Sequence, residues 1–333
     1  MPHASVSLSV RRTINRRRFL RGAVWLSAGS AAYYALGCSS DSDSRAIPTD
    51  SPASPSDVVS SSEVTPMLLT GEFVAGQNNR FAVGLLDDQN NLVRNASVNG
   101  RFFKIGADGS TGTLRGEGAL TYNELNIPEL HEHDRSGSPD AGEEFVGFYV
   151  ANVPFDDAGK WGAEITASPE SGTAAKIQAP FEVLAQSKSP GIGTVPPASN
   201  NETTPPAPAD ESLCSRDPLC PFHDKVIADQ LGGGRPLVVQ FSTPAFCETR
   251  FCGPVLEALI QEAPAYQDRI DFVHVEVWKD FQAQQYREAV TEWNLPGEPY
   301  TFFIGGTGKV VGRLEAIFSE EELRSALDQL VAL

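Results

Sequence analysis

The strongest hydrophobic pattern lies in the C-terminal third of the chain, where an apolar run leads into a segment of helical periodicity. Residues 237–239 are apolar and mostly β-branched, which predicts a short buried strand. Apolar positions then recur at helical spacing over residues 255–260. Between these elements the chain presents Cys247 and Cys252. A cysteine at the mouth of a helix is placed to react, because the helix N-terminus favours the thiolate and lowers the thiol pKa.

Other elements surround this segment. Helical spacing predicts helices over residues 222–231, 281–293 and 320–330. Extended runs predict a strand over 271–277, a loop entering a strand over 295–304, and a strand over 309–314. The expected order is αβαβαββα, a layered α/β domain with a hairpin at one edge, over residues 213–333.

Residues 67–185 follow a different pattern. Short alternating runs recur over residues 80–86, 97–105, 145–150, 161–166 and 181–183, separated by turn-forming residues. No helix-period stretch of useful length interrupts them, so the pattern predicts a β-sandwich. The sequence Asp-Ala-Gly-Lys-Trp at 157–161 resembles the turn before a late core strand of immunoglobulin-like domains. The segment contains no cysteine, so the inter-sheet disulfide of antibody domains is absent.

Two segments have compositions typical of linkers. Residues 38–66 are dominated by Ser, Asp and Pro and show no apolar periodicity, which predicts a disordered tether. Residues 186–212 are rich in Pro and Ser, and their prolines favour extended conformations. We expect this second segment to act as a semi-rigid spacer.

The N-terminus has the features of an export signal. Residues 1–37 contain six arginines and no acidic residue, and residues 15–21 (Asn-Arg-Arg-Arg-Phe-Leu-Arg) resemble the twin-arginine translocation consensus. The apolar part is too short to span a bilayer. It ends in Ala-Leu-Gly-Cys38, which resembles a bacterial lipobox although Ala35 stands where Leu is usual. The resemblance implies an exported lipoprotein held on the bilayer through Cys38; the alternative is a signal segment with an incidental cysteine.

Charge and cysteine count narrow the functional classes. The chain carries a net charge of −17, and the part after the arginine-rich segment is more acidic still, which argues against a nucleic-acid partner. Five cysteines are present. Lipidation of Cys38 leaves Cys214, Cys220, Cys247 and Cys252, enough for two disulfides in a compartment that permits them.

The order of the C-terminal elements, the strand that runs into a cysteine-bearing helix, and the Gly-Glu-Pro299 loop before the hairpin resemble the thioredoxin-like superfamily. The resemblance covers residues 213–333. It implies that Cys247 is the attacking cysteine, Cys252 the resolving one, and Pro299 the cis-proline beside the active site. The expected fold class is therefore an all-β immunoglobulin-like sandwich followed by an α/β thioredoxin-like domain.

The resemblance implies a membrane-anchored, extracytoplasmic thiol–disulfide oxidoreductase. It would need no cofactor, and its partners would be client protein thiols or disulfides and a further redox protein. One alternative is a non-enzymatic lipoprotein whose disulfides are structural and whose β-sandwich binds a partner. A lesser alternative is a copper or other metal carrier, since thiolates and imidazole suit Cu(I), but no histidine is singled out by its place in the sequence.

Three departures from the family matter. The cysteines are spaced as Cys-x-x-x-x-Cys, and residues i and i+5 of an ideal helix lie roughly 8–9 Å apart between Cα atoms, whereas a disulfide needs less than about 7 Å. Cys247 must therefore lie in the loop ahead of the helix and fold back if the two are to pair. An offset alignment that makes Cys252 the nucleophile is also open. Gln240 stands where thioredoxin often has a buried acid, which would make thiol release less efficient.

The remaining cysteines and histidines allow several interpretations. Cys214 and Cys220 predict a local structural disulfide, although exchange with Cys247 or Cys252 is an alternative. His223 is a possible base or ligand, but a plain role near the helix start is favoured. His131 and His133 lie in a polar loop and could chelate a metal, yet solvated runs of this composition are common.

These assignments predict a labile Cys247–Cys252 disulfide and a resistant Cys214–Cys220 disulfide. Peptide mass spectrometry of the fragment from Met67 onward, before and after mild dithiothreitol, should show selective opening of the first bridge. If both bridges resist reduction, or if cysteines of the two segments pair with each other, the disulfides are structural. The oxidoreductase interpretation then fails.

Overall fold

The computed structural model describes residues 64–89, 91–106, 109, 112–126, 145–169, 174–204, 213–247 and 251–333. All of them belong to one compact unit, and 43% of them are in strands and 15% in helices. The predicted signal, Cys38, His131 and His133 lie outside the described residues. Within the described ranges, no helix has both the length and the apolar character needed to cross a bilayer.

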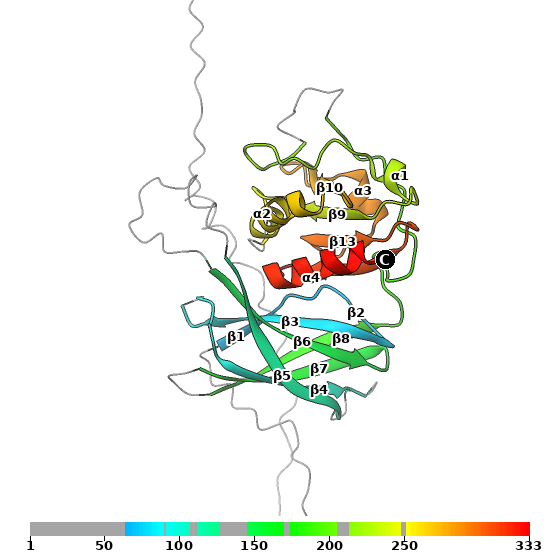
Figure 1. Ribbon diagram of the computed structural model, residues 1–333. Helices are drawn as coiled ribbons and strands as arrows, with labels where there is room; N and C mark the ends of the chain where they lie inside the picture. Colours follow the sequence, from blue (N-terminus) through cyan, green and yellow to red (C-terminus); the bar gives the residue numbers. More distant parts are fainter. Residues whose placement is uncertain are drawn as a thin grey trace, which may run out of the picture. The chain divides into compact units, whose positions relative to one another are not determined.

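The first half of the described chain forms a single eight-stranded mixed sheet (Figure 1). Its strand order is β1-β3-β6-β5-β4-β7-β8-β2, and every neighbouring pair is antiparallel except β2 and β8. The strands are β1 (Val64–Leu68), β2 (Phe73–Val74), β3 (Gln77–Asp87), β4 (Ser97–Lys104), β5 (Thr113–Asn126), β6 (Phe145–Phe155), β7 (Gly159–Ser168) and β8 (Ala175–Leu184).

The predicted immunoglobulin-like sandwich of two sheets is wrong. Strand β5 is the reason, because it carries the ladder from one half of the sheet to the other. Its first part, up to Leu120, pairs with β4, and from Thr121 onward it pairs with β6. A continuous strand shared in this way joins all eight strands into one curled sheet.

The curl follows from the chain path and from an aromatic core. Strands β1 and β2 lie at opposite ends of the strand order but are separated by only residues 69–72, so the sheet must bend until its edges approach. The interior of the bend is filled by buried aromatic side chains. Phe81 and Phe102 pack edge to face with their ring centroids 5.0 Å apart, and Phe155 and Trp161 do so at 4.9 Å. Such pairs add to the stabilisation that comes from burial alone.

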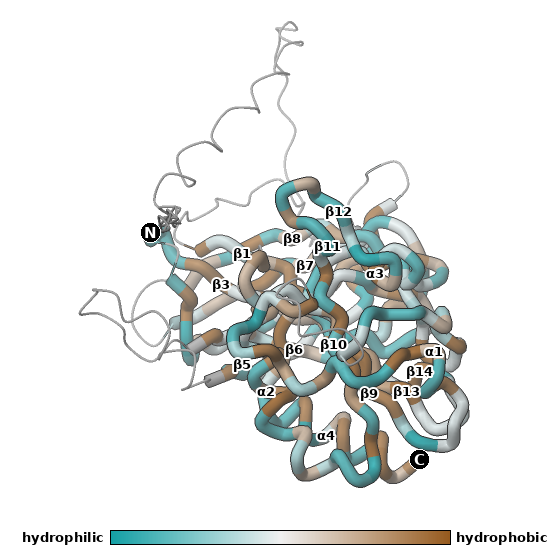
Figure 2. Tube along the Cα trace, turned by 90° about the horizontal axis from the view of Figure 1, so that it is seen from above, coloured by the Kyte–Doolittle hydropathy of each residue, from teal (hydrophilic) through white to brown (hydrophobic). Residues whose placement is uncertain are grey.

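The second half of the described chain contains a four-stranded sheet of order β10-β9-β13-β14, in which β9 is parallel to β10 and antiparallel to β13. A short β11–β12 hairpin lies beside it and is largely hydrophilic in Figure 2. The elements are α1 (Ile227–Gln230), β9 (Leu237–Ser242), α2 (Cys252–Glu262), the 3₁₀ turn η4 (Ala263–Ala265), β10 (Asp271–Glu276), β11 (Trp278–Asp280), β12 (Gln285–Tyr286), α3 (Glu288–Glu292), β13 (Tyr300–Ile304), β14 (Val310–Glu315) and α4 (Glu320–Val331).

The prediction of a layered α/β thioredoxin-like domain over residues 213–333 is also wrong, because the described residues contain few helices. The helix expected over residues 222–231 shrinks to α1, since the carbonyl of Phe222 accepts a hydrogen bond from the His274 N–H and that of His223 accepts from Thr204. Those carbonyls are therefore not used within a helix. The helix expected over 281–293 shrinks to α3, because the preceding residues turn into the β11–β12 hairpin. Only α2 and α4 keep close to their expected extents.

A buried polar network ties the segment after β8 to the rest of the compact unit. Glu72 accepts hydrogen bonds from the hydroxyls of Ser187 and Ser189 and forms an ion pair of 3.0 Å with Arg313. Arg313 also pairs with Glu315 at 2.7 Å. The described part of the predicted spacer is residues 186–204, and its first residues are thus packed against the rest of the compact unit.

We expect Arg313→Ala to lower the free energy of unfolding by about 3–5 kcal/mol, because it leaves two buried carboxylates without their cation. Arg324→Ala is the matched control. Arg324 is half exposed and pairs with Glu262 and Glu320, so its loss should cost much less. Urea unfolding followed by tryptophan fluorescence measures both, and equal effects would contradict the importance of the network.

Candidate functional site

Cys247 and Cys252 are brought together at the start of helix α2. Strand β9 ends at Ser242, a turn follows, and Cys247 lies in the loop ahead of the helix, whose first residue is Cys252. The backbone N–H of Cys252 donates a hydrogen bond of 3.3 Å to the Sγ atom of Cys247. The expectation that Cys247 precedes the helix and folds back towards Cys252 is confirmed. A backbone donor at this position stabilises a thiolate on Cys247.

The two sulfur atoms lie in different environments. Cys252 is fully buried, whereas Cys247 is partly exposed. Burial raises the pKa of the Cys252 thiol well above its ordinary value, and the hydrogen bond and charge of Cys247 raise it further. Cys252 therefore stays protonated while Cys247 remains open to solvent. This asymmetry suits the roles that the sequence predicts, with Cys247 as the attacking thiol.

Pro299 follows a cis peptide bond with Glu298 and lies directly before strand β13. Strand β13 pairs with β9, with Tyr300 opposite Phe241, so the cis bond lies at the same end of the sheet as the cysteine loop. A carboxylate oxygen of Glu298 and the sulfur atoms of Cys247 and Cys252 all lie within 4.8 Å of one another. Sequence reasoning missed Glu298, and its position next to Pro299 was the one signal that could have found it.

Gln240 lies in the middle of strand β9, flanked in register by His274 and Thr301. It is fully buried, and neither amide atom of its side chain has a hydrogen-bond partner among the described residues. An amide cannot take up or release a proton at ordinary pH. Among the described residues, the carboxylate grouped with the two sulfur atoms is that of Glu298.

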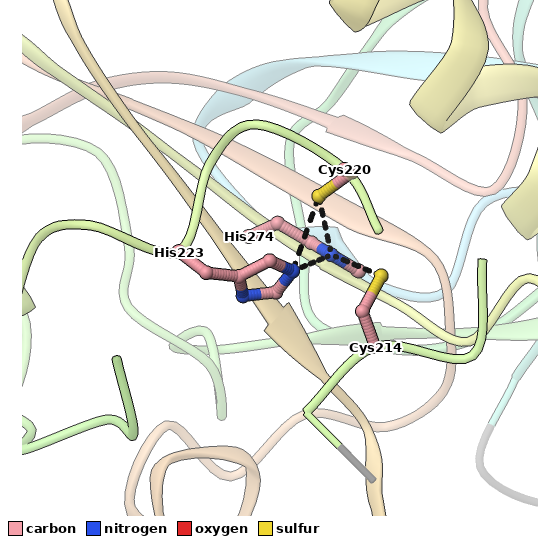
Figure 3. Close-up of side chains that lie close together, drawn as sticks. All are labelled: Cys214, Cys220, His223 and His274. Carbon is pink, nitrogen blue, oxygen red and sulfur yellow. Dashed lines mark hydrogen bonds between the residues drawn. The ribbon is translucent and has the colours of Figure 1, made fainter. Parts of the chain in front are cut away.

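A second cluster joins the other cysteine pair to two histidines (Figure 3). Cys214, Cys220 and His223 come from the segment before α1, and His274 comes from strand β10. The Nδ1 atom of His274 lies 3.6 Å from Cys214 Sγ, 3.3 Å from Cys220 Sγ and 3.3 Å from His223 Nε2. Cys220 Sγ lies 3.1 Å from His223 Nε2. All four ligand atoms thus face one another.

The two thiols of this cluster affect each other. The hydrogen bond from Cys220 is the main cause that lowers the pKa of Cys214, while burial and the neighbouring Cys214 raise the pKa of Cys220. All four residues of the cluster are buried, so the two thiols are kept away from solvent.

The predicted Cys214–Cys220 disulfide is not formed in this structure, where both cysteines are free thiols. The pairing therefore stays a prediction from the sequence. In the structure, two histidines lie beside the two thiols. His223 lies in this cluster, with its Nε2 atom facing Cys220 and His274, and its plain role near the helix start stays a prediction. His274 was missed, although it is the one basic residue in the apolar run of β10.

The two clusters are connected through the backbone of the cysteine loop. The N–H of Ala245, two residues before Cys247, donates a hydrogen bond of 3.1 Å to the hydroxyl of Ser215, which follows Cys214. Ser242, at the end of β9, contacts His274 through its hydroxyl at 2.9 Å. The same strand end thus supports both clusters.

Comparison with known proteins gives no further assignment, because no family model and no curated protein matches this sequence. The functional inference therefore depends on the sequence motifs and on the geometry of the two cysteine clusters.

In the reduced protein we expect limiting iodoacetamide to modify Cys247 and to leave Cys252 unmodified at neutral pH. Raising the pH to about 8.5, where an ordinary thiol is half ionised, should still leave Cys252 unmodified, because its pKa is raised and its sulfur is buried. Peptide mass spectrometry measures the labelling, and the urea-unfolded chain is the control in which both react. Preferential labelling of Cys252 would contradict the assigned asymmetry.

Proposed function

We propose that this protein is a thiol–disulfide oxidoreductase that exchanges disulfides through Cys247 and Cys252. The observation that carries the proposal is the Cys252 N–H directed at Cys247 Sγ at the start of α2, with the cis bond before Pro299 beside it. An accessible thiol at a backbone donor, next to a buried partner thiol, is the arrangement that disulfide exchange requires.

The exchange conserves atoms and electrons as follows. The Cys247 thiolate attacks one sulfur of a client disulfide, and the other client sulfur leaves as a thiolate, giving a mixed disulfide. Cys252 then loses its proton to Glu298 and attacks Cys247 Sγ, so that the second client sulfur leaves. The products are a Cys247–Cys252 disulfide and a reduced client, and the reverse sequence oxidises a client dithiol.

Glu298 has a specific task in this scheme. The buried Cys252 thiol has a raised pKa, so its attack needs a base close by. Glu298 is the carboxylate grouped with both sulfur atoms. In this scheme it does the work of the buried acid that thioredoxin-like proteins often have at the position of Gln240.

An aromatic surface beside Cys247 supports a protein client. Phe246, which precedes Cys247, is 41% exposed and stacks on Phe281 with ring centroids 4.6 Å apart. Trp278 continues the row and stacks on Tyr286, which is 50% exposed. Exposed aromatic groups next to a reactive thiol suit an apolar polypeptide segment.

The export signal and lipidation at Cys38 remain proposals that rest on sequence motifs. They would place the thiol site outside the cytoplasm, tethered to the membrane, where disulfides persist. The main alternative is a non-enzymatic lipoprotein that binds a partner through its β-sheet region. The partly exposed Cys247 beside Glu298 favours exchange, since a purely structural bridge needs neither feature.

Glutathione disulfide provides a direct test on the full chain. With Cys252→Ser we expect a glutathione adduct to accumulate at Cys247, because the resolving thiol is missing. With Cys247→Ser we expect no adduct at Cys252, which is buried. Intact-mass and peptide mass spectrometry measure both variants, and absence of the adduct in Cys252→Ser would overturn the proposed function.

Glu298→Gln should slow release of glutathione from the mixed disulfide by about 100-fold, the lower range for loss of a general base. The first attack by Cys247 should change much less. Glu288→Gln, which removes an equal charge at an exposed position of α3, is the matched control. Stopped-flow mixing across a pH series separates the steps. If the release of glutathione is unchanged in Glu298→Gln, or equally slowed in Glu288→Gln, Glu298 is not the base for Cys252.

A further inference from the structure

The cluster of Cys214, Cys220, His223 and His274 has no part in the proposed exchange chemistry, yet its four ligand atoms all lie within 4.8 Å of one another. We propose that these four side chains bind one Zn²⁺ ion as a structural, four-coordinate site. The proposal does not depend on the activity of Cys247 and Cys252.

The spacing of the ligand atoms fits zinc. A tetrahedral ion with Zn–S of about 2.3 Å and Zn–N of about 2.0–2.1 Å holds its two nitrogens about 3.3 Å apart and each sulfur about 3.5 Å from each nitrogen. The two nitrogens here are 3.3 Å apart. The three sulfur–nitrogen distances are 3.1, 3.3 and 3.6 Å. The side chains thus need only small shifts to take up the ion.

The orientation of His274 is fixed for ligation. Its Nε2 atom lies 3.1 Å from the backbone carbonyl of Ser242 and 2.9 Å from the Ser242 hydroxyl. Because a carbonyl can only accept, the proton is held on Nε2, and Nδ1 presents its lone pair to the two sulfurs. A ligand histidine whose second nitrogen donates to a backbone carbonyl is a recurrent feature of metal sites.

The burial of the site favours a structural ion over a catalytic or transported one. None of the four residues is more than 4% exposed. Four protein ligands complete a tetrahedral shell, so no position remains for water or substrate. Two thiolates and two imidazoles form a donor set that suits Zn²⁺.

The ion would attach one segment to the sheet. Three ligands lie within residues 214–223, which contain no helix or strand, and the fourth lies on strand β10. Apart from the proposed ion, this segment is held by hydrogen bonds such as that from the Ser215 N–H to Glu276, by the Arg216–Glu257 ion pair, and by the packing of Phe222 on Phe272. A disulfide between Cys214 and Cys220 would close only a local loop and would leave both histidines without a function.

The test uses the full chain exposed to Zn²⁺ and then freed of excess metal by gel filtration, with elemental analysis as the measurement. We expect one zinc per chain, retained in Cys247→Ser and Cys252→Ser and lost in Cys214→Ser and His274→Ala. Retention in Cys214→Ser with loss in Cys247→Ser would move the metal to the other cysteine pair and overturn the proposal. Absence of zinc, or a Cys214–Cys220 disulfide in the zinc-treated protein, would also overturn it.

Co²⁺ provides a readout that does not depend on a variant losing its ligand. The Co²⁺-loaded chain should show the visible bands of tetrahedral cobalt and a thiolate-to-metal charge-transfer band. In His223→Cys we expect the metal to stay bound and the charge-transfer band to grow, since a third thiolate is added. An unchanged band in this variant would show that position 223 is not a ligand and would contradict the site, even if Cys214→Ser fails to fold.

Discussion

The pairing of strand β9 with β10 on one side and β13 on the other is the constraint on which both cysteine clusters depend. All six residues of β9 are buried, and alternate side chains point to opposite faces of the sheet. The strand therefore has a fixed register, and its end at Ser242 has a fixed position. The loop that carries Cys247 begins there, the cis bond before Pro299 lies opposite, and Ser242 itself orients His274. A slip of this register would disrupt both clusters together.

In the two proposals the thiol group serves two different purposes because its surroundings differ. The Cys247 sulfur is partly exposed, has a backbone donor and lies next to a carboxylate, which suits the proposed exchange with a client disulfide. The sulfurs of Cys214 and Cys220 are enclosed with two imidazoles and cannot reach such a disulfide. In the proposed zinc site they would also be held as metal-bound thiolates, which protects them from exchange with Cys247. Separation of reactive and structural thiols is necessary where four cysteines share one compact unit.

Local patterns allowed part of this structure to be predicted. The apolar run of β9, the periodicity of α2 and the turn between them depend on neighbouring residues, and the cysteine loop was expected for a geometric reason that holds in the structure. Long-range features could not be read in the same way. Strand β5 contains two glycines and several charges, so its alternation is weak, yet it joins the whole curled sheet. His274 becomes a ligand only when a distant segment packs on its strand.

The link between the clusters has a physical consequence for the loop that carries Cys247. A loop that must present a thiol needs support from outside itself, since residues ahead of a helix have few hydrogen bonds of their own. Ser215 supplies one, by accepting from the Ala245 N–H, and Ser215 lies next to a proposed zinc ligand. An ion that fixes Cys214 would also fix the acceptor on which this loop rests. The proposed metal site would then contribute to the position of Cys247 without taking part in electron transfer, which explains why a closed site lies so close to an open one.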